Sequence, residues 1–266
     1  MSVSSLINRC IEYAQTVDKE AQKNYVEVII KDLRGMNPRI VFEADAFFVP
    51  NNEYFLEILG PIAMDYDMGF YSRDGVCLWD NTLVFPVPDV FGEYVGLAAF
   101  DPLNYAKAHE TNNYEFGYYK YSRKDIYPHR YYFYGLKGTF DKAYEDGYLV
   151  LTDGVFDTLS FASLGYNAWA ALGSSISEQM LAQLRFIKKV IVAMDNDAAG
   201  LKMYHYLSRH LDNVCCLIQG ETKDADEILK TEHSKKYLQK LDSIISFPFV
   251  MDSICTTRSR FHELSL

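Results

Sequence analysis

Aspartates follow two short apolar runs in the second half of the chain. Asp153 comes directly after Tyr148–Thr152. Asp195 comes directly after Val190–Met194, and Asp197 lies two residues further on. Short apolar runs of this kind predict buried strands of a parallel sheet, and ligands bind where such strands end. Carboxylate oxygens suit Mg²⁺ and Mn²⁺, so the pattern predicts a metal site for chemistry on phosphates.

Further carboxylates could reach the same edge of the sheet. Asp157 lies one helical turn after Asp153, and Asp224 and Asp226 follow a fourth apolar run. Each acid could instead serve only as a turn residue or a helix cap. Because the pattern occurs in consecutive strand–helix units, we favour the metal site over the purely structural alternative.

Strands alternate with helices from residue 147 onward, which predicts right-handed βαβ crossovers. The expected strands are Tyr148–Thr152, Ala168–Leu172, Val190–Met194 and Val214–Ile218, and the expected helices are 156–164, 175–186 and 198–211. Ser175 and Glu178 fit a capping box for the second helix. From about residue 224 to the end the pattern is mostly helical.

The first half of the chain has a mixed pattern. Residues 3–34 carry apolar residues at helical spacing, and 83–86 and 94–100 read as two strands around a turn. We expect 104–134 to be irregular or to form short strands. The fold class is therefore an α/β domain with a parallel-rich sheet flanked by helices, preceded by an α+β subdomain and followed by a short helical tail.

Composition narrows the function classes. The chain has 266 residues, a formal net charge of −10 and five cysteines without a Cys-x-x-Cys pair. This cysteine usage predicts neither a zinc site nor a disulfide framework. No apolar run approaches the roughly 20 residues of a membrane helix, and the first residues do not read as a signal peptide, so we expect a soluble, intracellular protein.

Basic residues gather within 118–142, where six Lys and Arg against two Asp give +4. The candidates for contact with nucleic acid or nucleotide are Lys120, Arg123, Lys124 and Arg130. Tyrosines interleave with them, and aromatic stacking combined with phosphate contacts suits a single strand. The alternative is that these tyrosines are half-buried strand residues with polar tips.

These motifs resemble the Toprim domain, which occurs in bacterial-type DNA primases, topoisomerases and some nucleases. The resemblance rests on Asp153-Gly154-x-x-Asp157, Leu172-Gly173-Ser174 and Asp195-Asn196-Asp197-Ala198-Ala199-Gly200. The primase branch matches more of the chain. Its motifs are similar to Phe85-Pro86-Val87 with Gly92-x-x-Val95-Gly96, Tyr134-Gly135-Leu136 and Lys223-Asp224-Ala225-Asp226-Glu227.

The resemblance implies a primase catalytic core, with an N-terminal subdomain at 1–145, a Toprim domain at 146–230 and a helical tail at 231–266. Such a core makes short RNA primers from ribonucleoside triphosphates on single-stranded DNA. Asp195 and Asp197 would hold Mg²⁺ or Mn²⁺, with Asp153 as ligand or base. The expected partner is a replicative helicase or another replication protein, in the cytoplasm, or in the host cytoplasm if a phage encodes the chain.

The chain departs from the family pattern at three points. Asp153 stands where the family has Glu, Gly96–Phe100 replaces a Gly-Phe-Gly-Gly-Arg-like run, and no zinc-binding template reader is recognisable. Two alternatives therefore stay open: a Toprim nuclease that uses water as the nucleophile, and a non-catalytic nucleic-acid-binding subunit. The chain is too short for the strand-passage domains of a topoisomerase.

Overall fold

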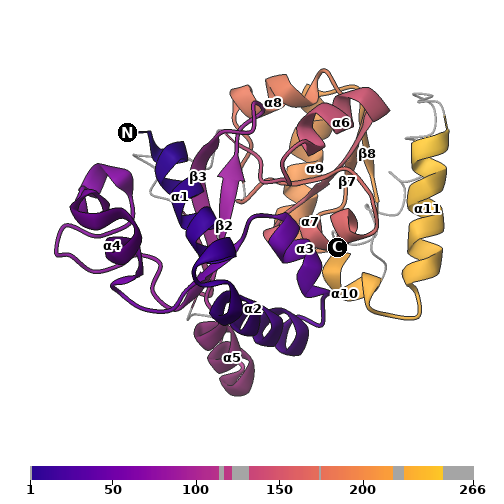
Figure 1. Ribbon diagram of the computed structural model, residues 1–266. Helices are drawn as coiled ribbons and strands as arrows, with labels where there is room; N and C mark the ends of the chain where they lie inside the picture. The colour runs from indigo at the N-terminus through magenta and orange to yellow at the C-terminus, as the bar shows by residue number, and fades with distance from the viewer. Residues whose placement is uncertain (1, 114–116, 122–131, 174, 218–224, 248–266) are drawn as a thin grey trace.

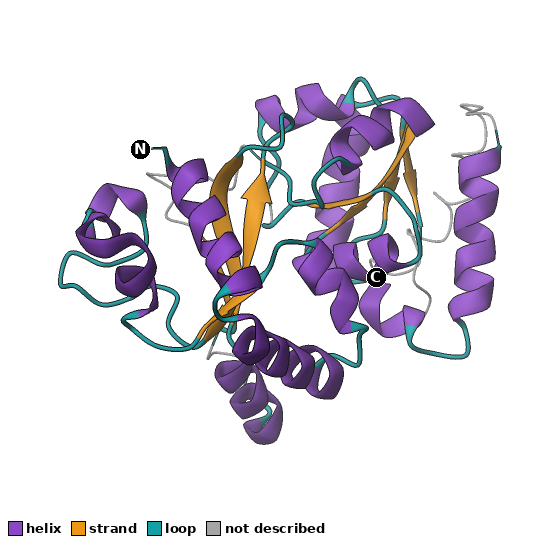
Figure 2. Cartoon of the chain, in the orientation of Figure 1, coloured by secondary structure: helices purple, strands orange, loops and turns teal. Residues whose placement is uncertain are grey.

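A computed structural model of the chain describes residues 2–113, 117–121, 132–173, 175–217 and 225–247 (Figure 1). These residues form two units with a sheet each, which Figure 2 shows side by side. We call them the antiparallel unit, up to residue 121, and the parallel unit, from residue 132 onward. Among the described residues, no helix has both the length and the apolar character needed to cross a lipid bilayer.

The antiparallel unit contains a four-stranded sheet in the order β1-β2-β3-β4. The strands are β1 (Phe47–Val49), β2 (Thr82–Pro88), β3 (Tyr94–Phe100) and β4 (Tyr119–Tyr121). Around them lie α1 (Val3–Thr16), α2 (Lys19–Glu27), the π-helical turn η1 (Val28–Leu33), α3 (Pro38–Glu43), α4 (Tyr54–Leu59), the short 3₁₀ turns η2 (Gly60–Met64) and η3 (Tyr66–Met68), and α5 (Pro102–Thr111).

Two predictions for this unit are confirmed and one is wrong. Residues 3–34 are helical apart from the break between α1 and α2, and β2 and β3 form the expected antiparallel hairpin, with Phe85 opposite Ala98. Residues 102–111 form a helix rather than irregular chain. Asp101 caps this helix by accepting the N–H of Asn104 at 3.0 Å, and Pro102 occupies its first turn, where proline costs no hydrogen bond.

The parallel unit has the strand order β6-β5-β7-β8, with all three pairs parallel. Its strands are β5 (Tyr148–Thr152), β6 (Ala168–Ala170), β7 (Lys189–Val192) and β8 (Val214–Cys216), and its helices are α6 (Thr139–Asp146), α7 (Val155–Ser163), α8 (Glu178–Leu184) and α9 (Ala198–His210). Tyr134 pairs with Ala170 in an isolated antiparallel bridge, which covers the backbone of the edge strand β6.

The βαβ alternation is confirmed, but some boundaries differ from the prediction. The strands β6 and β7 end two residues earlier than predicted. The predicted cap of α8 is wrong: the Ser177 hydroxyl, not that of Ser175, accepts the N–H of Met180 at 3.3 Å. A single Ser-rich stretch offers several capping positions, and packing of the helix decides between them.

The described part of the tail consists of α10 (Ala225–Leu229) and α11 (Ser234–Ser246), and α11 lies along the outer side of the parallel unit (Figure 1). The buried Lys189 ammonium, at the start of β7, holds the end of α11. It donates to the carbonyls of Ile244, Ile245 (3.0 Å) and Phe247 (2.6 Å). A cation is favourable there because the C-terminal end of a helix carries partial negative charge.

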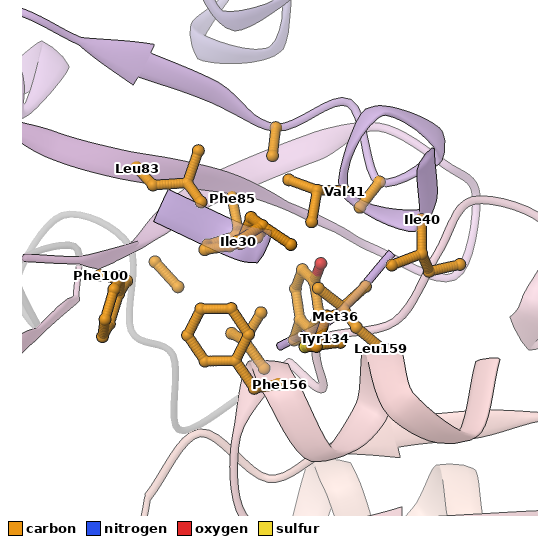
Figure 3. Close-up of a cluster of buried hydrophobic side chains, with 14 of the residues drawn as sticks. Ile30, Met36, Ile40, Val41, Leu83, Phe85, Phe100, Tyr134, Phe156 and Leu159 are labelled. Carbon is orange, nitrogen blue, oxygen red and sulfur yellow. The ribbon is translucent and has the colours of Figure 1, made fainter. Parts of the chain in front are cut away.

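The two units share one hydrophobic cluster (Figure 3). Ile30, Val41 and Phe85 of the antiparallel unit pack with Phe156 and Leu159 of α7. The rings of Phe85 and Phe156 meet edge to face with centroids 5.7 Å apart. The antiparallel unit therefore packs directly against α7, the helix that follows β5.

Candidate active site

The structure brings Asp153 and Asp195 together at the carboxyl ends of neighbouring strands. Asp153 follows β5, Asp195 follows β7, and the backbone N–H of Asp195 donates to Oδ2 of Asp153. Both side chains are partly exposed. The pairing follows from the parallel register, in which Leu151 lies beside Val192, so both strands deliver their next residues to one edge.

Buried hydroxyls hold the turn that carries Asp153. The hydroxyls of Thr152 and Thr158 lie 2.8 Å apart, and both residues are fully buried. Thr158 also donates to the carbonyl of Gly154 at 3.1 Å. Polar groups buried in this way are satisfied only in one arrangement of the turn, so they fix its conformation.

A strained residue lies next to this turn. Leu172, just after β6, has a φ of 54°, and its N–H donates to the carbonyl of Asp153 at 3.1 Å. A non-glycine residue in this region costs roughly 1–3 kcal/mol and persists only where its surroundings hold it. The loop after β6 is thereby tied to the acidic turn.

Asp197 serves as the cap of α9. Its Oδ1 accepts the N–H groups of Ala199 at 2.8 Å and of Gly200 at 2.9 Å, and the residue is exposed. Asp197 therefore has the capping role that the sequence offers as the alternative to metal binding. The same contacts aim the amide end of α9, which favours negative charge, at the edge where Asp195 lies.

Gly200 permits a very close approach of α9 to the acidic loop. A Cβ atom at this position would lie 2.0 Å from the carbonyl oxygen of Asp195, far inside any real contact. Only glycine allows the first turn of α9 to pack against Asp195 in this way. A pocket beside it is lined by Asp195, Asn196, Asp197 and Tyr204, among others.

Asp157 and Asp226 lie together, but in a buried network of hydrogen bonds and ion pairs. Asp226 is only 3% exposed, and its carboxylate contacts Arg34 at 2.9 Å, Lys230 at 2.6 Å and the Ser160 hydroxyl at 2.7 Å. Its N–H donates to Oδ1 of Asp157 at 3.0 Å. Both oxygens of Asp226 are thus engaged. Asp224 lies outside the described residues.

The donor set fits a hard divalent cation that also binds substrate. Within the described ranges, no group of three or more His, Cys, Asp or Glu side chains is gathered closely enough to hold a metal ion by itself. Mg²⁺ usually takes only one or two protein carboxylates and completes its shell with water and substrate phosphates. Asp153 and Asp195 provide such a pair, with Asp197 two residues further on.

The structure describes only one of the four basic residues that the sequence offers as nucleic-acid contacts. Lys120 on β4 is partly exposed and lies 3.4 Å from the carboxylate of Asp101. Arg123, Lys124 and Arg130 lie outside the described residues. No sequence pattern singled out Arg34, because arginine side chains are mostly exposed and are buried only where a partner is supplied.

Comparison with known proteins finds similarity to one described family within the parallel unit and to solved structures over most of the chain. Residues 150–229 match the model of a family described as Toprim-like. A DNA primase of Thermotoga maritima is 34% identical over 115 residues, which span 41% of this chain and 20% of that protein. The matched part is thus far shorter than the curated relative.

Solved structures match over nearly the whole chain. The zinc-binding and RNA polymerase domains of the Aquifex aeolicus primase superpose with a TM-score of 0.72 at 22% identity, covering 98% of this chain and 65% of that one. A primase catalytic domain bound to single-stranded DNA gives a TM-score of 0.69 at 18% identity, covering 91% and 78%. With its Toprim-like domain packed on an antiparallel sheet, the chain has the fold of the bacterial-type DNA primase catalytic core.

Proposed function

We propose that this chain synthesises short RNA primers on single-stranded DNA by metal-dependent nucleotidyl transfer. The observation that carries the proposal is the Asp153–Asp195 pair at the edge of a parallel sheet, next to a second unit that shares its core. The curated relatives are DNA primases, and one matching structure holds single-stranded DNA. The second unit distinguishes this arrangement from an isolated Toprim module.

In this proposal Asp153, Asp195 and Asp197 hold Mg²⁺ or Mn²⁺ together with the phosphates of a ribonucleoside triphosphate. A bound divalent ion supplies Lewis-acid stabilisation of the charge that develops on the transferring phosphoryl group. The amide end of α9 faces the same edge and favours the anionic substrate. Asp157 is a second-rank ligand candidate, as is Asp224.

Lys120, Arg123, Lys124 and Arg130 are the proposed contacts to template or nucleotide. Neutralising one side chain that binds a phosphate should flatten the dependence of log affinity on log salt by roughly 0.7. The triple variant Lys120→Gln, Arg123→Gln, Arg130→Gln should therefore bind a labelled single strand more weakly and with a smaller salt slope. An unchanged slope would move the template path elsewhere on the chain.

The net charge of −10 repels a polyanionic template at long range. We therefore propose that a helicase or another DNA-bound replication protein supplies the template, in the cytoplasm of the cell or of an infected host. Tethering of this kind gives effective concentrations of about millimolar. The isolated chain should bind single-stranded DNA with a dissociation constant weaker than about 1 µM at physiological salt. Nanomolar binding would argue against the need for a partner.

The deciding experiment incubates the chain with single-stranded DNA, labelled ribonucleotides and either Mg²⁺ or Mn²⁺. New short RNA supports the proposal, shortened DNA indicates a nuclease, and neither product indicates a binding subunit. Asp195→Asn should abolish synthesis. Asp212→Asn is the matched control, because Asp212 is an exposed acid that precedes β8, at the opposite end of the sheet. Equal synthesis by both variants would contradict the site.

A further inference from the structure

Arg34 is a charged side chain buried at the junction of the two units. It directly follows η1 in the antiparallel unit, and its side chain is only 12% exposed. Its guanidinium lies 4.3 Å from the ring centroid of Phe156 and 2.9 Å from the carboxylate of Asp226. Both partners belong to the parallel unit, so one side chain joins segments 192 positions apart in sequence.

The partner of Arg34 is itself attached to α7. Asp226 accepts from the Ser160 hydroxyl at 2.7 Å, and its N–H donates to Asp157 at 3.0 Å. Together with Phe156 under the guanidinium, three positions within the first six residues of α7 are held by Arg34 or Asp226. These contacts combine a cation–π contact, a charge-assisted hydrogen bond and two further hydrogen bonds, which leaves α7 little freedom to shift.

The position of α7 bears directly on the acidic edge. The helix begins at Val155, two residues after Asp153, with only Gly154 between them. The hydroxyl that holds the carbonyl of Gly154 belongs to Thr158, a residue of α7, so the conformation of the turn depends on the position of the helix. A displacement of the first turn of α7 would therefore be passed on to that carboxylate.

We propose that Arg34 is a positioning residue, which with Asp226 clamps α7 and so fixes Asp153 at the edge of the sheet. Asp226 is then an anchor whose oxygens are engaged by Arg34, Lys230 and Ser160, and not a metal ligand. Replacing a buried ion pair by well-packed apolar residues often costs no stability, so the role we assign to this pair is to fix the arrangement of α7. The consequence for catalysis rests on the proposed function, whereas the clamp itself does not.

The test compares Arg34→Met, which keeps the stem and removes the charge, with Arg34→Lys and with the double variant Arg34→Met, Asp226→Asn. Arg39→Met is the matched control, because Arg39 lies on the neighbouring helix α3 with its side chain 83% exposed and pairs with Glu43 of the same helix. The full chain is used throughout. Circular dichroism first establishes that each variant is folded.

The first measurement is amide hydrogen exchange in Val155–Ser163, which needs no activity. Arg34→Met should exchange about tenfold faster there, because the buried Asp226 loses one of its two cationic partners and Phe156 loses the guanidinium above it. Arg34→Lys should recover part of the protection, and Arg39→Met should match the parent. Unchanged exchange of α7 in a folded Arg34→Met would overturn the clamp.

The second measurement is primer synthesis. Arg34→Met should lower kcat by up to about 10²-fold with little change in the KM for nucleotide, because a misplaced group loses rate rather than ground-state binding. The double variant should be at least as active as Arg34→Met, since position 226 then carries no buried charge that depends on Lys230 alone. If Asp226 were instead a metal ligand, the double variant would be the less active of the two. If the parent makes no primers, the proposed function fails, and the exchange result still decides the clamp.

Discussion

Replacing Gly200 by alanine tests whether the close approach of α9 sets the position of Asp195. Gly200 has an ordinary helical backbone in the first turn of α9, where alanine would otherwise favour the helix by roughly 1 kcal/mol. The new Cβ would lie 2.0 Å from the carbonyl oxygen of Asp195 and 3.3 Å from its backbone nitrogen. Helix propensity thus predicts that alanine stabilises the protein, whereas packing predicts that it destabilises the protein.

The size of the effect follows from the distance. Real Cβ contacts are not shorter than 3.0 Å, so helix and loop must separate by about 1 Å. Overpacking of this kind costs typically about 1–3 kcal/mol, more than the gain in propensity. A displacement of about 1 Å at a reacting group can cost about 10²-fold in rate. We therefore expect a net loss of stability and a much larger proportional loss of activity.

Urea denaturation and primer synthesis in Mg²⁺ measure the two effects on the same protein. The matched control is Gly154→Ala at the corresponding turn after β5, because a Cβ there meets only Asp157 Oδ2, at 3.4 Å, and φ is −125°. That variant should stay close to the parent in stability. A Gly200→Ala protein that is more stable than the parent and fully active would show that the approach of α9 does not position Asp195.

Three further perturbations test other parts of the structure. Lys189→Met should lower the free energy of unfolding by about 1–3 kcal/mol, because three carbonyls at the end of α11 lose a charged donor. Urea titration measures this loss, and Lys188→Met, at an exposed position, is the control. Asp153→Asn should lose most primer synthesis whereas Asp153→Glu keeps some, and an Asn variant as active as the parent would make Asp153 a turn residue only. Burial raises the pKa of the Cys10 thiol from about 9.0 to about 12. The contribution of this thiol to stability should therefore be fully present below about pH 9 and be lost between about pH 9 and 12, because the unfolded chain loses this proton first. Cys10→Ala should flatten that fall in urea midpoints, and equal curves would exclude the thiol as its source.

Local patterns in the sequence predicted the parallel sheet well. The apolar runs before Asp153 and Asp195 and the paired runs around residue 90 are strands in the structure. Strand burial and chain direction determine which residues leave a sheet at its carboxyl edge, and these are properties of short segments. The meeting of Asp153 with Asp195 could be predicted for this reason.

Capping was less predictable. The helix α5 was missed, although Asp101-Pro102 is a regular helix start, because the aromatic and basic residues beyond it suggested irregular chain. The capping-box pattern predicts the cap of α8 at Ser175, two residues before Ser177, which caps the helix in the structure. Several polar residues in each stretch can cap a helix equally well, and the choice depends on how the helix packs.

The amino-acid sequence alone determined the strands, the helices that alternate with them and the acids that leave the sheet at one edge. Tertiary structure alone decided that Arg34 pairs with Asp226, that Lys189 holds the end of α11 and that Gly200 touches Asp195. Periodicity records only which face of a segment is buried. Which distant groups share a buried site depends on how whole elements pack, and a buried charge is stable only where that packing supplies its partner.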